Sequence, residues 1–125
     1  MKLTAWGNYP VVDAHVDYLE SVESLKKIMR LGKKFIAYGN GRSYGDQALN
    51  EHVIFTKKYN YITDFDSQKG IITCQCGVKL EEILDVIVPK GWFLQVTPGT
   101  KYITVGGAIA SDVHGKNHHK EGTFC

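Results

Sequence analysis

Long apolar runs are missing from this 125-residue chain, and so is an excess of charge of one sign. No stretch approaches the roughly 20 apolar residues that cross a bilayer, and residues 1–6 lack the apolar run of a secretory signal. The net charge is +2, and the Lys and Arg residues are scattered along the chain. A nucleic-acid-binding domain would cluster them. We therefore expect a cytoplasmic protein that neither spans a membrane nor binds nucleic acid.

Cysteine is scarce as well, with three residues in the chain. An odd number argues against a disulfide framework. Cys74 and Cys76 are two residues apart, which would place both on one face of a strand. We expect these thiols to be reduced, with Cys125 exposed at the end of the chain. The composition, 43% hydrophobic and 22% charged, is ordinary for a globular domain with a modest core.

The spacing of apolar residues switches repeatedly between helical and strand periods, which predicts an α+β fold with helices on a small mixed sheet. Ser21 and Thr104 are the expected N-caps of two of the helices. The predicted helices span residues 22–29, 80–87 and 104–110. The predicted strands span residues 34–38, 52–56, 61–65, 71–76 and 93–96. A polar turn joins the third and fourth strands into a hairpin, and the polar stretch 112–124 is predicted to be irregular.

A loop with three glycines, residues 39–45, follows the first predicted strand directly. Glycine allows positive φ and close approach of the backbone to a ligand, and successive N–H groups in such a loop form anion-binding nests. Arg42 and Ser43 add further donors. The alternative is an ordinary surface turn. The loop has no Gly-Lys-Ser/Thr ending and no helical pattern after it, so it matches neither the Walker A loop nor the dinucleotide-binding fingerprint.

A second glycine-rich segment, residues 98–107, ends in the predicted short helix that Thr104 caps. The first turn of a helix presents free N–H groups and a partial positive charge, which suit a phosphate. Gly106 and Gly107 remove the side chains that would obstruct a diphosphate. The alternative is that these glycines allow the helix to pack closely on the sheet, and both explanations can hold together.

The polar stretch 112–119 contains three histidines, a lysine and an asparagine within six residues. Three interpretations remain open. It is a solvated loop, or a metal site that uses His114 and His118 with the cysteine pair, or the edge of an active site where His and Lys bind or deprotonate a hydroxyl.

Taken in order with residues 3–7, these three segments resemble the PCMH-type FAD-binding domain of the vanillyl-alcohol-oxidase superfamily, and in particular the decaprenylphosphoryl-β-D-ribose 2-oxidases. The resemblance covers nearly the whole chain. It implies an FAD-binding fold of two α+β subdomains with FAD between them. Residues 1–125 would form the first α/β subdomain and the start of the second, and a second chain or self-association could complete the fold.

The resemblance also implies site residues by position. Two amide-rich loops, residues 39–46 and 99–107, are expected to bind one diphosphate, and His114 and Lys116 are expected to face the substrate as catalytic residues. The implied cofactor-binding residues are Ala37, Tyr38, Gly39, Asn40, Gly41, Arg42, Ser43, Tyr44, Gly45, Asp46, Gln47, Gly99, Thr104, Val105, Gly106, Gly107, His114, Gly115, Lys116 and Asn117.

Tyr44 occupies the position at which covalent-flavin members of the superfamily carry a histidine, so the resemblance implies non-covalent FAD. The implied activity is oxidation of a secondary alcohol of a sugar or sugar-lipid, with hydride transfer to flavin N5. The alternative from another class is a non-catalytic fragment that binds a nucleotide or a partner.

Overall fold

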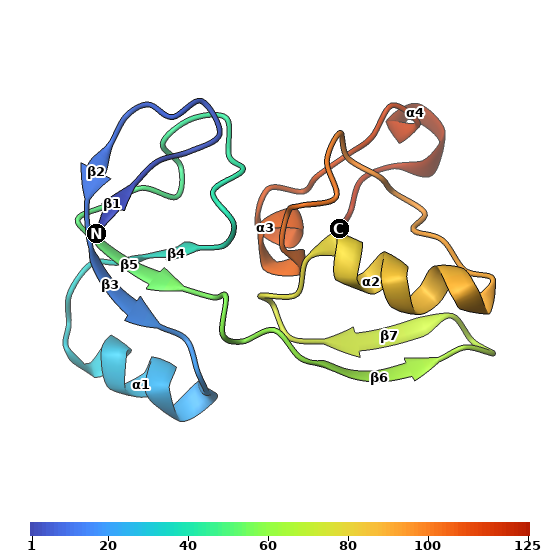
Figure 1. Cartoon of the computed structure of the whole chain (residues 1–125), viewed down its shortest axis with the longest axis horizontal. Helices are drawn as coiled ribbons and strands as arrows, with labels where there is room; N and C mark the ends of the chain where they lie inside the picture. The colour runs from blue at the N-terminus through green and yellow to red at the C-terminus, as the bar shows by residue number, and fades with distance from the viewer. The chain divides into compact units, whose positions relative to one another are not determined.

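The order of helices and strands confirms an α+β chain, but the strands form three separate sheets and not one mixed sheet. The computed structural model describes residues 1–125, which divide into two units, Met1–Tyr59 and Asn60–Cys125 (Figure 1). We call them unit 1 and unit 2 and describe each by itself. None of the helices has both the length and the apolar character needed to span a bilayer.

A three-stranded parallel sheet forms the centre of unit 1, in the order β3 (His15–Tyr18), β5 (His52–Phe55), β4 (Ile36–Tyr38). All four residues of β5 are buried, as expected for a central parallel strand that is covered on both faces. A small antiparallel pair, β1 (Lys2–Leu3) and β2 (Val12–Asp13), precedes this sheet. The sequence pattern does not predict β1, β2 and β3, because each strand is too short or too polar to show an alternation of apolar and polar residues.

The helix α1 (Val22–Arg30) begins where the sequence predicts it. The Ser21 hydroxyl accepts a hydrogen bond from the Ser24 amide at 3.0 Å, and the Ser24 hydroxyl accepts one from the Ser21 amide at 3.0 Å. This reciprocal pair satisfies amides that the helix itself leaves unpaired. The helix ends at Arg30 with Leu31 as its C-cap, and Gly32 follows with a φ of +67° that an L-residue rarely adopts.

The core of unit 1 fixes the end of β4. Leu3, Ala14, Val53 and Phe55 are buried, and the Tyr38 ring stacks on the Phe55 ring with centroids 4.9 Å apart. Because Tyr38 is the last residue of β4, the loop that follows starts from an anchored position.

Unit 2 is built on the antiparallel hairpin of β6 (Ile62–Asp66) and β7 (Ile71–Cys74), which was predicted. The helix α2 (Leu80–Ile87) runs along this hairpin (Figure 1) and buries its apolar stripe. A 3₁₀ turn, η1 (Val88–Lys90), follows α2 and ends at Gly91 with a φ of +83°. The fully buried core residues of unit 2 are Val78, Leu80, Ile83 and Ile87.

The cysteine pair differs from the prediction. Strand β7 ends at Cys74, so Cys76 lies beyond it and the expectation of a shared strand face is wrong. All three cysteines are free thiols, and Cys125 is exposed. Burial raises the pKa of both Cys74 and Cys76, which favours their protonated form at neutral pH.

The predicted strand at residues 93–96 is also wrong, because no neighbouring strand pairs with this stretch. The short helix α3 (Val105–Ala110) does form, with Thr104 as its N-cap. The stretch 112–124 is less irregular than predicted, since it contains the single-turn helix α4 (His118–Glu121) and an antiparallel bridge between His114 and Thr123.

The hairpin turn of unit 2 depends on Asp66, Gly70 and Trp92. The Asp66 carboxylate accepts hydrogen bonds from the Gln68 and Lys69 amides, both at 3.0 Å. The indole N–H of Trp92 donates to the Ser67 carbonyl at 2.6 Å. Gly70 has a φ of +68°, and the space where its Cβ would lie is filled by the Trp92 ring.

We expect Gly70→Ala to destabilise unit 2 more than Gly91→Ala. Both residues have a left-handed φ, whose strain costs about 1–2 kcal/mol in an L-residue. A methyl group at Gly70 would also displace the Trp92 ring, whereas nothing lies within 4 Å of the corresponding position at Gly91. Overpacking of this kind adds about 1–3 kcal/mol. Urea unfolding followed by tryptophan fluorescence measures both losses, and equal losses would contradict the proposed contact.

Candidate functional site

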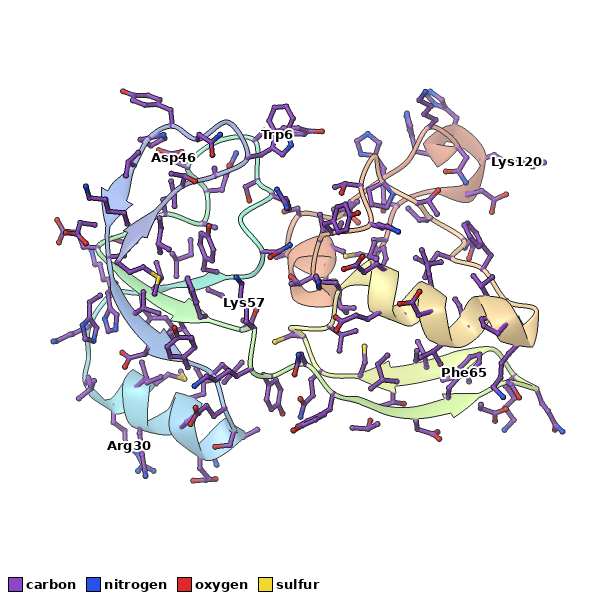
Figure 2. All side chains as sticks on the ribbon, in the orientation of Figure 1. Trp6, Arg30, Asp46, Lys57, Phe65 and Lys120 are labelled. Atoms are coloured by element: carbon purple, nitrogen blue, oxygen red, sulfur yellow. The ribbon has the colours of Figure 1, made fainter.

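The glycine-rich loop of unit 1 is fastened to the N-terminal segment. The Tyr38 hydroxyl donates to the Thr4 carbonyl at 2.6 Å, and the Trp6 amide donates to the Ser43 carbonyl at 3.0 Å. The Trp6 ring meets Tyr44 edge to face, with centroids 6.0 Å apart. Figure 2 labels Trp6 in the N-terminal segment and Asp46 in the loop. Nothing in the sequence pattern predicts that the N-terminal segment holds this loop, and the contact appears only in the folded chain.

Four backbone amides of this loop have no hydrogen-bond acceptor in the structure: those of Gly39, Gly41, Ser43 and Tyr44. The next amide, that of Gly45, donates to the Gln47 side chain at 3.0 Å. Unpaired N–H groups close together in a turn form an anion-binding concavity. The donors of this loop are of the kind that bind an anionic group such as a phosphate.

Gly41 is glycine for a reason internal to the fold. Its φ is +65°, and a Cβ would lie 3.1 Å from Tyr38 Cζ and 3.3 Å from the Thr4 carbonyl oxygen. The Tyr38 side chain is also part of the core, where its ring stacks on the Phe55 ring. Burial raises the pKa of Tyr38, and the nearby Arg42 charge lowers it, so the neutral phenol remains the donor to Thr4. Any contact of Tyr38 with a cofactor would have to use its backbone.

The first turn of α3 differs from the expectation. The amides of Val105 and Gly106 donate to the carbonyls of Val78 and Cys76 at 2.8 and 2.9 Å, and the Gly107 amide donates to the Thr104 hydroxyl at 3.1 Å. These three N–H groups are therefore not free for a phosphate, contrary to the prediction.

Close packing explains the glycine at position 106. A Cβ there would lie 3.0 Å from the Cys76 Cβ. The packing alternative thus accounts for Gly106, and a role of residues 104–107 in cofactor binding stays a prediction.

A hollow in unit 2 gathers several of the predicted site residues. Gly99, His114, Gly115, Lys116 and His118 line a cavity of about 310 Å³. His118 is an addition to the predicted set, and its ring lies 4.8 Å from that of His114 in an edge-to-face arrangement. No regular spacing in the sequence signals this contact, because His114 lies in a β-bridge outside α4.

The two glycines that line this hollow, Gly99 and Gly115, differ in the space that a side chain would have. Gly115 is buried, and a Cβ there would lie 3.1 Å from the Thr97 carbonyl carbon. Nothing lies within 4 Å of the corresponding position at Gly99. Internal packing therefore explains Gly115, and it leaves Gly99 open to the approach of a ligand.

Hydrogen bonds fix the loop that carries His114 and Lys116. The Asn117 amide side chain donates to the Gln95 carbonyl at 3.2 Å, and the Val113 amide donates to the Ala108 carbonyl at 3.0 Å. Asp112 accepts from the Cys125 amide at 3.1 Å. Hydrogen bonds from Thr123 and Cys125 hold the pKa of Asp112 below its usual value. Asp112 is thus an ionised anchor of the loop.

Comparison with known proteins agrees with this geometry. A family model described as an FAD binding domain matches residues 14–125. The decaprenylphosphoryl-beta-D-ribose oxidase of Mycolicibacterium smegmatis is 44% identical over 130 residues, which cover 98% of this chain and 28% of that protein. The chain therefore spans just over a quarter of the length of this relative.

Solved structures show the same fold. Cholesterol oxidase from B. sterolicum matches with a TM-score of 0.78 at 15% identity, over 91% of this chain and 24% of that one. An alkyldihydroxyacetonephosphate synthase matches with a TM-score of 0.69 at 20% identity, over 86% of this chain and 22% of that one. With the family model spanning most of its length, this chain belongs to the FAD-binding domain family of flavin-dependent oxidoreductases, whose cofactor is FAD.

Proposed function

We propose that this chain forms the FAD-binding part of an enzyme that oxidises a secondary alcohol of a sugar or sugar-lipid. In this proposal residues 1–125 are part of a PCMH-type domain. The relative that is a decaprenylphosphoryl-ribose oxidase supports the substrate class, since its similarity extends over nearly the whole chain. When bound, FAD supplies the redox chemistry by accepting a hydride at N5.

The observation that carries the proposal is the set of unpaired amides at Gly39, Gly41, Ser43 and Tyr44. These N–H groups would donate to the diphosphate oxygens, while Arg42 supplies positive charge nearby. The remaining predicted contacts in residues 37–47 would come from the same stretch of backbone. Because the first-turn amides of α3 are already paired, residues 104–107 would present a close-packed backbone surface to the cofactor and few donors.

His114 and Lys116 are the proposed substrate-side residues. Both line the hollow beside Gly99, and both are exposed. A lysine ammonium donates hydrogen bonds and a neutral imidazole accepts a proton. The two side chains would contact the substrate hydroxyl. The base would be the neutral imidazole, or the lysine in its neutral amine form, and it would take the hydroxyl proton as the hydride leaves carbon.

Binding of FAD tests the first part of the proposal. We expect the purified chain to bind added FAD, and we expect Gly41→Ala to weaken binding at least tenfold, because the methyl group would force the loop away from Tyr38. Gly32→Ala is the matched control, since Gly32 has a similar φ of +67° but no atom within 4 Å and no place in the loop. Titration followed by flavin fluorescence measures both. A chain that binds no FAD would favour the non-catalytic alternative.

The attachment of the flavin is testable separately. A phenol at Tyr44 does not replace the imidazole that forms the covalent flavin link, so we expect the FAD to be held without a bond to the protein. Acid precipitation of the FAD-loaded protein should leave a colourless pellet and release the flavin to the supernatant. A yellow pellet would contradict this expectation.

A test of the substrate-side roles requires a protein that contains this chain, has FAD bound and is reduced by an added sugar alcohol. We expect His114→Ala and Lys116→Ala each to slow anaerobic bleaching of the flavin. The residue that accepts the proton should account for a loss of about 10²-fold or more. Lys120→Ala is the control, because Lys120 is exposed and lies outside the lining of the hollow. Unchanged bleaching rates in both His114 and Lys116 variants would exclude these roles.

A further inference from the structure

A second group of side chains with ligand chemistry lies in unit 1, on the strands of the parallel sheet. His15 and Asp17 are on β3, and His52 is on β5. The strand register pairs His15 directly with His52. Residues i and i+2 of a strand share a face, so Asp17 points to the same side as both histidines. Nothing in the FAD-binding proposal uses these three residues.

The donor atoms of this cluster are close together. Asp17 Oδ2 lies 2.6 Å from His52 Nε2 and 3.6 Å from His15 Nε2. The three ligand atoms lie within 4.8 Å of one another, and the two imidazole rings meet edge to face with centroids 4.9 Å apart. Two imidazole nitrogens and one carboxylate oxygen form a ligand set that zinc and related ions accept.

The three side chains of the cluster differ in their exposure to solvent. The side chain of His52 is 10% exposed, that of Asp17 33%, and that of His15 71%. The Phe35 ring lies 6.4 Å from the His52 ring and adds an apolar neighbour. His52 and Asp17 are therefore held in place, while His15 is free to rotate toward an ion from the solvent side.

The position of the cluster separates it from the FAD loop. His15 and His52 are the first residues of β3 and β5, whereas the glycine-rich loop follows the last residue of β4. Because the three strands are parallel, their starts lie at one end of the sheet and their ends at the other. The starts of β3 and β5 are therefore at the opposite end from the last residue of β4. The two sites can therefore be tested independently.

We propose that His15, Asp17 and His52 bind one divalent first-row transition-metal ion, with Zn²⁺ as the representative ligand. Zinc takes nitrogen and oxygen ligands at about 2.0–2.2 Å, so ligand atoms around a tetrahedral ion lie roughly 3.3–3.5 Å apart. The 2.6 Å hydrogen bond between Asp17 and His52 would therefore open slightly to admit the ion, and the exposed His15 would rotate to bring its nitrogen to the same ion. Three protein ligands leave a fourth position for water. Since the ligands come from two strands, the ion links β3 to β5 and stabilises unit 1.

Zinc titration of the untagged, chelator-treated chain tests the site. Isothermal calorimetry is expected to show one Zn²⁺ per chain, and saturating Zn²⁺ is expected to raise the unfolding midpoint of unit 1. His15→Ala should weaken binding at least tenfold and abolish this shift. Because the His15 side chain is exposed, its removal should leave the fold intact. Asp17→Asn, which keeps the side-chain shape, should weaken binding as well.

The double variant His118→Ala/His119→Ala is the matched control, because it removes the histidine pair of unit 2 and leaves the cluster intact. It should bind Zn²⁺ as the unchanged chain does. Electron paramagnetic resonance of the Cu²⁺-loaded chain should show two imidazole nitrogens on the ion, and one in His15→Ala. The proposal is overturned if the chain binds no Zn²⁺, or if only the double variant loses binding.

Discussion

The hydrogen bond between the Tyr38 hydroxyl and the Thr4 carbonyl is the contact on which the candidate cofactor loop depends. A hydrogen bond of this kind contributes only about 1 kcal/mol in net terms, but Tyr38 is buried and Thr4 is partly buried. Losing either one leaves a polar group unsatisfied, which costs more than the bond itself contributes. The same hydroxyl excludes any side chain at position 41, so the glycine there follows from the core of unit 1 before any ligand is considered.

The two glycine-rich segments differ in which hydrogen bonds the fold gives their N–H groups. In the loop after β4, four amides stay unpaired. At the start of α3 the carbonyls of Cys76 and Val78 pair with the helix amides first. Unpaired amides are therefore found in the loop after β4 and not in the first turn of α3. Membership of the FAD-binding domain family fits this distribution, because a single loop of this kind already offers several donors.

The parts that could be predicted from sequence are those set by local chemistry. Ser21 fixed the start of α1, and the polar turn that contains Asp66 fixed the hairpin, because caps and turns depend on neighbours in the chain. The stretch 93–96 has strand composition but finds no partner strand, and pairing is a property of the whole fold. The pairing of the α3 amides and the alignment of His15 with His52 could not be predicted either, because each joins residues that are distant in sequence.

The strand β3 forms one edge of the three-stranded sheet, with β5 as its only neighbour. An uncovered edge offers a row of unpaired backbone groups to another chain, and charged side chains on such a strand discourage that addition. Asp17 lies on this strand and is partly exposed to water. A strand added at this edge would desolvate the exposed part of the Asp17 carboxylate. The negative charge of Asp17 therefore opposes edge-to-edge aggregation of neighbouring copies.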